Sequence, residues 1–264
     1  MKQFGIDTSV WNGDFDFKSA VENYDVEFAI IKAGGRSIGE DRSCYVDRQF
    51  NASYTKCKKQ CLPVGCYWFA NFTNEEECIE EANYFIGQCL RGRQFNLPIF
   101  VDVEADRMLA LSASRLTDLV TLFCSRLESA NYFVGIYSSL GAFKYNMDDV
   151  ILQRFVHWVA CWSTSCKYPY KESFGFWQFG GETNLLKNRI INGGIVDQNY
   201  MLIDYTQIIP CTGRNGYETK IDINKVVDDV IKGLYGVGVE RRKKIESLGL
   251  SYDLVQSLVN ERLK

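Results

Sequence analysis

The chain has 264 residues, of which 46% are hydrophobic and 24% charged, a composition ordinary for a soluble globular protein with a well-buried core. Its net charge of −3 argues against nucleic acid as the main ligand, because proteins that bind phosphate backbones carry a basic excess. No apolar run approaches the roughly 18–20 residues that span a bilayer, so no membrane insertion is expected. The first residues enter a strand at once, which predicts no secretory signal and synthesis in a cytoplasm.

Short apolar runs typical of strands recur through the first 200 residues. They are Phe4–Asp7, Phe28–Ala33, Pro63–Phe69, Ile99–Glu104, Phe133–Tyr137, His157–Cys161, Phe174–Phe179 and Ile195–Asp197. Helical patterns lie between the earlier runs, for example from Glu75 to Leu90 and from Ser112 to Ser129. Eight strands alternating with helices predict an α/β fold with a parallel barrel. Because the last three strands lie too close together for full helices, we expect an incomplete TIM-like (β/α)5β3 barrel.

The composition changes sharply near Pro210. All 17 Phe, all 5 Trp and all 10 Cys lie before residue 219, and the turn-rich segment Cys211–Gly216 follows Pro210. Three amphipathic stretches then cover Ile223–Leu234, Val239–Leu248 and Tyr252–Leu263, punctuated by glycines. The sequence therefore predicts a catalytic barrel over 1–207, a linker over 208–220 and a small all-α three-helix module over 221–264.

Cysteine and histidine usage argues against several kinds of site. The ten cysteines lack the paired spacing of a zinc site, and His157, in a run that predicts a buried strand, is the only histidine. We expect reduced thiols that pack as small apolar residues, with no metal and no cofactor. A nucleophilic Cys–His or Ser–His site is also disfavoured, because no nucleophile elbow is present.

Asp102 and Glu104 form the most informative pair of residues. Two positions apart on a strand, they point the same way, with Cα atoms roughly 6–7 Å apart. Two carboxylates held this close repel each other, and one of them should keep its proton near neutral pH. A proton donor beside an anion is what cleavage of a glycosidic bond needs, whereas the alternative is a pair of solvated acids at a strand end.

Two further acids fall at predicted strand ends. Asp7 closes the first strand and Asp197 the last, and these strands become neighbours when a barrel closes. Each acid alone is more often a capping or solvated residue, but parallel barrels build their active sites at the carboxyl ends of their strands. Four acids collected at one end are electrostatically costly, which favours a functional interpretation.

Aromatic residues repeat this placement. Six candidates for stacking against sugar rings lie at or just after strand ends: Trp11, Tyr67, Trp68, Tyr137, Trp162 and Trp177. The alternative is that some of them fill the core, which is the role we expect for Trp158.

Several segments resemble the glycoside hydrolase family 25 lysozymes, in the right order over about residues 4–200. They are Phe4–Asn12, Phe28–Gly34, Gly65–Phe69, Leu97–Glu104, Gly135–Ser139, Trp177-Gln178 and Val196-Asp197. The resemblance implies an N-acetylmuramidase that cuts the β-1,4 bond from N-acetylmuramic acid to N-acetylglucosamine in bacterial peptidoglycan. It assigns Glu104 as the general acid. Asp102 would orient the substrate's own 2-acetamido group as nucleophile, and Asp7 and Asp197 would shape the site and its charge.

The tail resembles the three-helix cell-wall-binding repeats of phage lysins, through Val230–Gly238, Arg241, Gly249 and Tyr252–Asn260. This resemblance implies wall contacts at Arg241, Tyr252 and Gln256. The tail departs from the repeat at Tyr235 and Val237, where the family has Trp and Asn. Only one repeat is present, so avidity would need oligomerisation through this module or help from the catalytic cleft.

These resemblances together imply a phage endolysin, made in the bacterial host's cytoplasm and reaching the wall after holin-dependent release. Two alternatives stay open: a catalytically silent wall-binding protein, and a glycosidase acting on another N-acetylated polymer. Within the leading hypothesis, Asp102 or Asp197 could instead act as a direct nucleophile or as a base for water.

Overall fold

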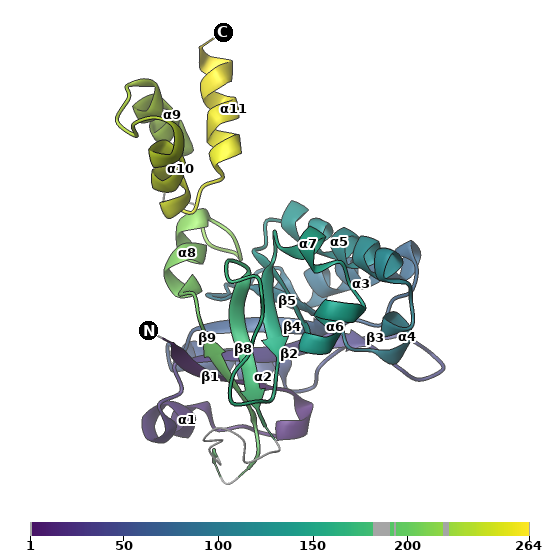
Figure 1. Ribbon diagram of the computed structural model, residues 1–264. Helices are drawn as coiled ribbons and strands as arrows, with labels where there is room; N and C mark the ends of the chain where they lie inside the picture. The colour runs from purple at the N-terminus through teal and green to yellow at the C-terminus, as the bar shows by residue number, and fades with distance from the viewer. Residues whose placement is uncertain (1, 182–190, 193, 219–221, 264) are drawn as a thin grey trace.

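The fold is a closed eight-stranded barrel followed by a helical tail, shown in Figure 1 by a computed structural model that describes residues 2–181, 191–192, 194–218 and 222–263. The barrel strands are β1 (Gln3–Thr8), β2 (Phe28–Arg36), β4 (Val64–Phe69), β5 (Ile99–Asp102), β6 (Val134–Ser139), β7 (Val156–Ala160), β8 (Phe174–Gly180) and β9 (Asp197–Met201). β1 pairs with both β2 and β9, which closes the sheet. The predicted barrel architecture is confirmed.

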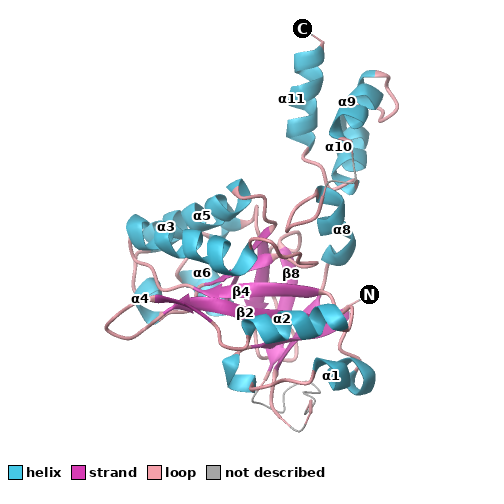
Figure 2. Cartoon of the chain, turned by 180° about the vertical axis from the view of Figure 1, so that it is seen from behind, coloured by secondary structure: helices cyan, strands magenta, loops and turns pink. Residues whose placement is uncertain are grey.

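Helices follow each of the first five barrel strands and cover the outside of the sheet (Figure 2). They are η1 (Val10–Asn12) and α1 (Phe17–Tyr24), α2 (Phe50–Lys59), α3 (Glu75–Tyr84) with η2 (Phe85–Leu90), α4 (Asp106–Leu109) and α5 (Ala113–Ser129), and α6 (Leu140–Tyr145) with α7 (Asp149–Leu152). Ser112 caps α5 by accepting a hydrogen bond from the Arg115 amide, and Asn74 caps α3 in the same way. No helix lies between β7 and β8, where too little chain is available.

The last strand corrects the expectation of an all-parallel barrel. β9 begins at Asp197, where the sequence predicts a strand end, and it runs antiparallel to both β1 and β8. Because its direction is reversed, its first residue lies at the same barrel end as the last residues of β1, and Asp7 pairs directly with Asp197. Asp197 therefore lies at the expected end of the barrel, although it begins its strand instead of ending it. The short strand β3 (Cys44–Val46), antiparallel to β2, was not predicted.

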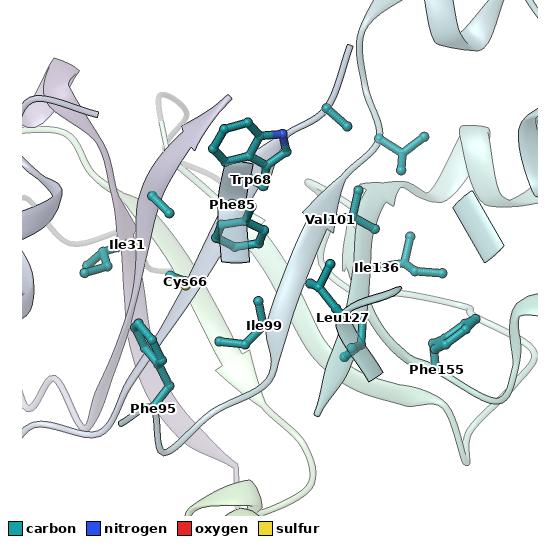
Figure 3. Close-up of a cluster of buried hydrophobic side chains, with 14 of the residues drawn as sticks. Ile31, Cys66, Trp68, Phe85, Phe95, Ile99, Val101, Leu127, Ile136 and Phe155 are labelled. Carbon is teal, nitrogen blue, oxygen red and sulfur yellow. The ribbon is translucent and has the colours of Figure 1, made fainter. Parts of the chain in front are cut away.

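Two hydrophobic cores hold the barrel. Phe28, Phe100, Trp158 and Phe176 fill its interior, with ring centroids 5.2–5.6 Å apart between neighbours. A larger core lies between the sheet and its helices, where Trp68 stacks on Phe85 (Figure 3). Because both of their faces are buried, β2, β4, β5 and β7 read as near-continuous apolar runs.

The segment predicted as a linker is structured where it is described. It begins inside α8 (Tyr205–Thr212), and the fully buried Asn215 then ties the chain to the barrel. The Asn215 side chain donates to the Leu97 carbonyl at 2.8 Å and accepts from the Phe133 amide at 2.7 Å. Leu97 and Phe133 precede β5 and β6, so this attachment lies at the amino end of the parallel strands, opposite the acids.

The tail has a small core of its own. Helices α9 (Ile223–Ile231), α10 (Gly238–Ser247) and α11 (Tyr252–Arg262) follow the predicted stretches, each one to three residues shorter or shifted. Their buried side chains are Val226, Val227, Val230, Ile245, Val255 and Val259. In Figures 1 and 2 these helices stand beyond α8, on the far side from the carboxyl ends of the parallel strands.

The remaining predictions concern His157 and the cysteines. His157 is fully buried in β7 and contacts the Tyr168 hydroxyl and the Leu152 carbonyl, and burial lowers its pKa to about 4. All ten cysteines are free thiols. In the part of the chain that the structure describes, no three His, Cys, Asp or Glu side chains gather as metal ligands, and no helix is long and apolar enough to cross a bilayer.

Candidate active site

Asp7 anchors the floor of the candidate site, at the carboxyl end of the parallel strands, which we call the mouth. Its Oδ2 accepts hydrogen bonds from Asn199 Nδ2 at 2.8 Å and from Gln178 Nε2 at 3.0 Å. Burial raises the pKa of Asp7 to about 6, and the charge of Glu104 adds to the rise while the two amides oppose it. Asp7 is therefore a firmly held carboxyl whose pKa lies well above that of an exposed aspartate.

Asp102 is the last residue of β5 and is almost fully buried. Burial, and then repulsion from Glu104 and Asp7, raises the pKa of Asp102 well above its ordinary value. Its Oδ1 has no hydrogen-bond partner among the described residues. A buried carboxyl oxygen without a partner costs stability, and at an active site it is free to accept a hydrogen bond from substrate.

Glu104 lies two residues beyond the end of β5 rather than within it, which shortens the predicted strand. The chain still runs beside β6 here, because the Val103 amide donates to the Tyr137 carbonyl at 2.9 Å. Although Glu104 as a residue is exposed, its carboxyl is enclosed enough that desolvation raises its pKa, against the pull of Lys32. An exposed acid with a raised pKa is well placed to give a proton to a bound ligand.

Tyr67 and Tyr137 show that the acids share one space. All four carboxyls, Asp102, Glu104, Asp7 and Asp197, raise the pKa of Tyr137, although its burial contributes most. Burial also dominates for Tyr67, whose pKa is raised further by three of the same acids. The Tyr137 hydroxyl donates to Gln178 Oε1 at 3.0 Å, so it is fixed in place. The structure thus brings the four predicted acids and two of the predicted tyrosines together.

Asp197 approaches the backbone after β8 very closely. A Cβ added to Gly181 would lie 1.9 Å from Asp197 Oδ1 and 3.4 Å from the Trp162 ring. Only glycine leaves room for the carboxylate at that point. Trp162 itself is 38% exposed at the rim and donates from Nε1 to Gln178 Oε1 at 3.1 Å.

The other predicted aromatic residues divide into one exposed and two buried side chains. Trp11 is 89% exposed on η1, held there because Ser9 accepts from the Trp11 amide. The prediction of a ligand contact is wrong for Trp68. Its side chain is fully buried between the barrel sheet and the surrounding helices, where its Nε1 donates to the buried Glu81 carboxyl at 2.8 Å. Trp177 is also wrong, since it packs on the outer core and donates to the Cys161 carbonyl at 2.8 Å.

The expected core role of Trp158 is confirmed. It fills the barrel directly beneath Tyr137, with ring centroids 4.4 Å apart, and its Nε1 donates to Asn199 Oδ1 at 2.8 Å. Because Asn199 also holds Asp7, this indole fixes an amide that orients a site carboxyl.

A groove of about 430 Å³ opens beside Glu104. Its lining comes from three segments of the mouth: Ile38, Phe69, Asn71, Glu104, Ala105, Asp106 and Arg107. Arg107 is held rigidly, since it donates to the Asn71 carbonyl at 2.6 Å and to Thr73 Oγ1 at 2.8 Å. An apolar ring, an acid and fixed polar groups are the features of a carbohydrate-binding groove.

Sequence reasoning missed Lys32, which faces the acids from β2. Its ammonium lies 4.7 Å from the Phe69 ring centroid and 5.8 Å from that of Tyr67. Its charge lowers the pKa of both Asp102 and Glu104 against the rise caused by burial. A lysine inside an apolar strand was the available signal, because a charge within a buried run is rare unless it is paired.

Gln178 and Asn199 were also missed as site residues. Both lie on the interior face of the last two strands, and both hold Asp7 Oδ2. Little in the sequence marks Gln178 and Asn199 as site residues, since side-chain amides carry no charge and are common at strand ends. Their function depends on which face of the strand turns inward, which is a tertiary property.

Two segments of the chain match known protein families. Residues 6–187 match the family model of glycosyl hydrolases family 25, and residues 224–263 match that of the CW_7 repeat. The chain belongs to glycosyl hydrolase family 25. It is therefore a glycoside hydrolase, with a C-terminal CW_7 repeat, as the sequence patterns predicted.

Individual relatives agree with this family assignment. The lysozyme of Streptococcus phage Cp-7 is 27% identical over 258 residues, covering 91% of this chain and 67% of that protein. The CTP1L endolysin structure superposes with a TM-score of 0.64 at 22% identity, covering 80% of this chain and 70% of that one. The structure of the bacterial lysozyme from Streptomyces coelicolor superposes with a TM-score of 0.61 at 22% identity, covering 79% of this chain and 96% of that one. At these identities the structures support the fold.

The position of Lys32 predicts a shift in the pH profile. Replacing it by Met removes the cation that favours ionised Asp102 and Glu104, so both carboxyl pKa values should rise. We expect the acidic and the basic limb of the plot of kcat/KM against pH to move to higher pH by about one unit in Lys32→Met. A neighbouring charge shifts the pKa of a carboxyl by about 1–3 units. Lys32→Arg keeps the charge and should keep the profile. Unmoved limbs in the Met variant would contradict this role.

Proposed function

We propose that the chain hydrolyses the β-1,4 bond between N-acetylmuramic acid and N-acetylglucosamine in bacterial peptidoglycan. The observation that carries the proposal is the gathering of Asp7, Asp102, Glu104 and Asp197 around Tyr137 in a family 25 barrel. The lysozyme name of the phage Cp-7 relative supports the same substrate.

Glu104 is the proposed general acid. Its carboxyl opens onto the groove, and its raised pKa favours the protonated form that delivers a proton to the leaving glycosidic oxygen. The bond from the sugar C1 to that oxygen then breaks, and the leaving sugar departs with the proton. The resulting Glu104 carboxylate can later take a proton from the attacking water.

Asp102 is proposed to act on the substrate's 2-acetamido group. The carbonyl oxygen of that group attacks C1 as the leaving bond breaks, and the Asp102 oxygen without a partner accepts the amide N–H. This hydrogen bond stabilises the positive charge that develops on the cyclic intermediate. Water then opens the intermediate at C1, which retains the anomeric configuration. In the competing version, Asp102 or Asp197 attacks C1 directly or activates water.

The helical tail is proposed as a separate wall-binding unit over 221–264. Three residues suggested by the repeat resemblance lie together: Gln256 Oε1 accepts from the Arg241 guanidinium at 3.3 Å and from the Tyr252 hydroxyl at 3.4 Å. Arg241 also donates to the Gly236 carbonyl at 2.9 Å. An ordered guanidinium beside a phenol and an amide can bind carboxylates and amides of a peptide stem.

The protein is proposed to be an endolysin that is made in the bacterial cytoplasm and reaches the cell wall through a lesion in the membrane. The proposed source of avidity is association of tails, or the catalytic groove holding the same glycan. A silent wall-binding protein and a glycosidase for another N-acetylated polymer are the alternatives to be excluded.

Product analysis tests the bond specificity. Purified peptidoglycan is digested, the fragments are reduced with borohydride, and the new reducing ends are identified by mass spectrometry. We expect reduced muramic acid ends, because cleavage after N-acetylmuramic acid frees its C1. Reduced glucosamine ends would instead identify a glucosaminidase. No new ends, together with retained wall binding, would leave a silent binding protein.

A further inference from the structure

Two cysteines lie on the loop between β7 and β8, at the rim of the mouth. Cys161 follows β7 directly and Cys166 comes five positions later, and both are half-buried. The loop turns back on itself: the Ser163 amide donates to the Cys161 carbonyl at 2.9 Å, and the Cys161 thiol donates to the Ser165 carbonyl at 3.8 Å. As a result, Cys166, which directly follows Ser165, lies beside Cys161 in the loop.

The other neighbouring thiols differ in accessibility. Cys66 lies near Cys89, and Cys78 near Cys124, but all four are fully buried in the core between sheet and helices. A dissolved oxidant does not reach such thiols without unfolding. Cys161 and Cys166 are instead only partly buried, on a loop that brings the two residues together.

This loop is connected to the site. The Cys161 amide donates to the Gln178 carbonyl at 3.0 Å, and the Cys161 carbonyl accepts from Trp177, so the start of the loop is fixed to β8. Trp162, between the two cysteines, donates to the Gln178 side chain. Gln178 in turn holds Asp7. A covalent closure from 161 to 166 would therefore clamp the segment that presents Trp162.

We propose that Cys161 and Cys166 are a modification site, at which a low-molecular-weight disulfide converts the two thiols reversibly into an intramolecular disulfide. One cysteine thiolate attacks the small disulfide, forms a mixed disulfide and releases one small thiolate. The second cysteine loses its proton and attacks the mixed disulfide, releasing the second. The protein loses two electrons and two protons, and the small disulfide is reduced to two thiols.

The redox conditions around the protein determine whether Cys161 and Cys166 are two thiols or one disulfide. Reducing cytosolic conditions keep such pairs as thiols, whereas oxidising surroundings allow them to close. Burial and the neighbouring Cys161 thiol raise the pKa of Cys166 to about 12, so exchange should accelerate as pH increases. The proposal concerns the loop chemistry and does not depend on which glycosidic bond the enzyme cuts.

The test uses the full-length native protein. It is incubated with oxidised glutathione at pH 8.5, alkylated with iodoacetamide, and digested with trypsin. Cleavage after Arg154 and Lys167 gives a peptide, 155–167, that contains only these two cysteines. We expect this peptide without alkyl groups and 2 Da lighter than its dithiol form, returning to two alkyl groups after reduction. Two alkyl groups after oxidation, or a lasting glutathione adduct, would overturn the proposal.

Stability gives a second, independent measurement. Closing a loop of six residues restricts the unfolded chain, so the oxidised protein should melt a few degrees higher than the reduced one. Cys161→Ser and Cys166→Ser are matched controls, since neither can form the bond, and their melting temperature should not respond to the oxidant. An equal rise in either serine variant would show that another thiol is responsible.

Discussion

Replacing Glu104 by Gln should reduce the release of reducing ends from peptidoglycan by about 10³-fold or more, within the range that general acid catalysis supplies. The amide keeps the size of the side chain at the groove but has no proton to donate to the leaving oxygen. The measurement is the initial rate of new reducing ends on purified walls. Asp118→Asn, which removes one charge from an exposed position of α5, should leave the rate unchanged.

Wall binding should persist in Glu104→Gln, because the tail lies at the opposite end of the barrel. Co-sedimentation with intact walls measures it without hydrolysis. Adding Arg241→Ala in the same background should lower the bound fraction, whereas Lys243→Ala, an exposed charge on the same helix, should not. Lysis by Glu104→Gln at the wild-type rate would place the acid elsewhere.

Asp102→Asn should lose activity by about 10²-fold or more and gain stability at neutral pH. The lost activity follows because an amide no longer stabilises positive charge on the substrate's acetamido group. The gain in stability follows because burial, Glu104 and Asp7 all disfavour the charged carboxylate. The folded-state pKa lies above the unfolded value, so stability falls as pH rises through that interval, and a neutral Asn avoids the loss. The melting temperature of Asp102→Asn should exceed that of the wild type by a few degrees at pH 7–8, and the difference should vanish below about pH 4.

Two measurements check this prediction. Melting curves of wild type and Asp102→Asn across pH 3–8 should converge at the acidic end, and parallel curves would contradict the assigned burial cost. Rates on walls whose sugars have been N-deacetylated separate the chemical routes, because substrate assistance needs the acetamido group. Full activity of Asp102→Asn on normal walls would exclude both the assisted route and Asp102 as nucleophile.

From the amino-acid sequence alone follow the succession of strands along the chain and the positions of the four acids on them. Buried strands are short apolar runs separated by helical periods, and Asp7, Asp102 and Glu104 interrupt or end those runs, so their common end of the barrel follows from parallel connectivity. The tail helices could be read for a similar reason, since Ile223–Ile231 and Tyr252–Arg262 keep one apolar face each, and Gly233 follows the first while Gly249 precedes the second.

Which side chains face the barrel interior is set by how the strands pack in three dimensions. Tyr67 and Trp68 are neighbours on β4 and must point to opposite faces, but both faces of a barrel strand are buried, so the apolar pattern does not tell inside from outside. The structure turns Tyr67 toward the acids and Trp68 toward the helices. Strand alternation allows only one of these two neighbours to reach the mouth, so predicting ligand contacts for both was inconsistent with it.

The reversal of β9 and the position of Lys32 were likewise tertiary decisions. A short strand buried on both faces carries no mark of its direction, and Asp197 begins β9 where the sequence predicted an end. Lys32 is one charge in an apolar run, and its meaning comes from Asp102 and Glu104, which lie about 70 residues later in the chain. Residue type is local, but the field at a carboxyl is set by whatever the fold brings near it.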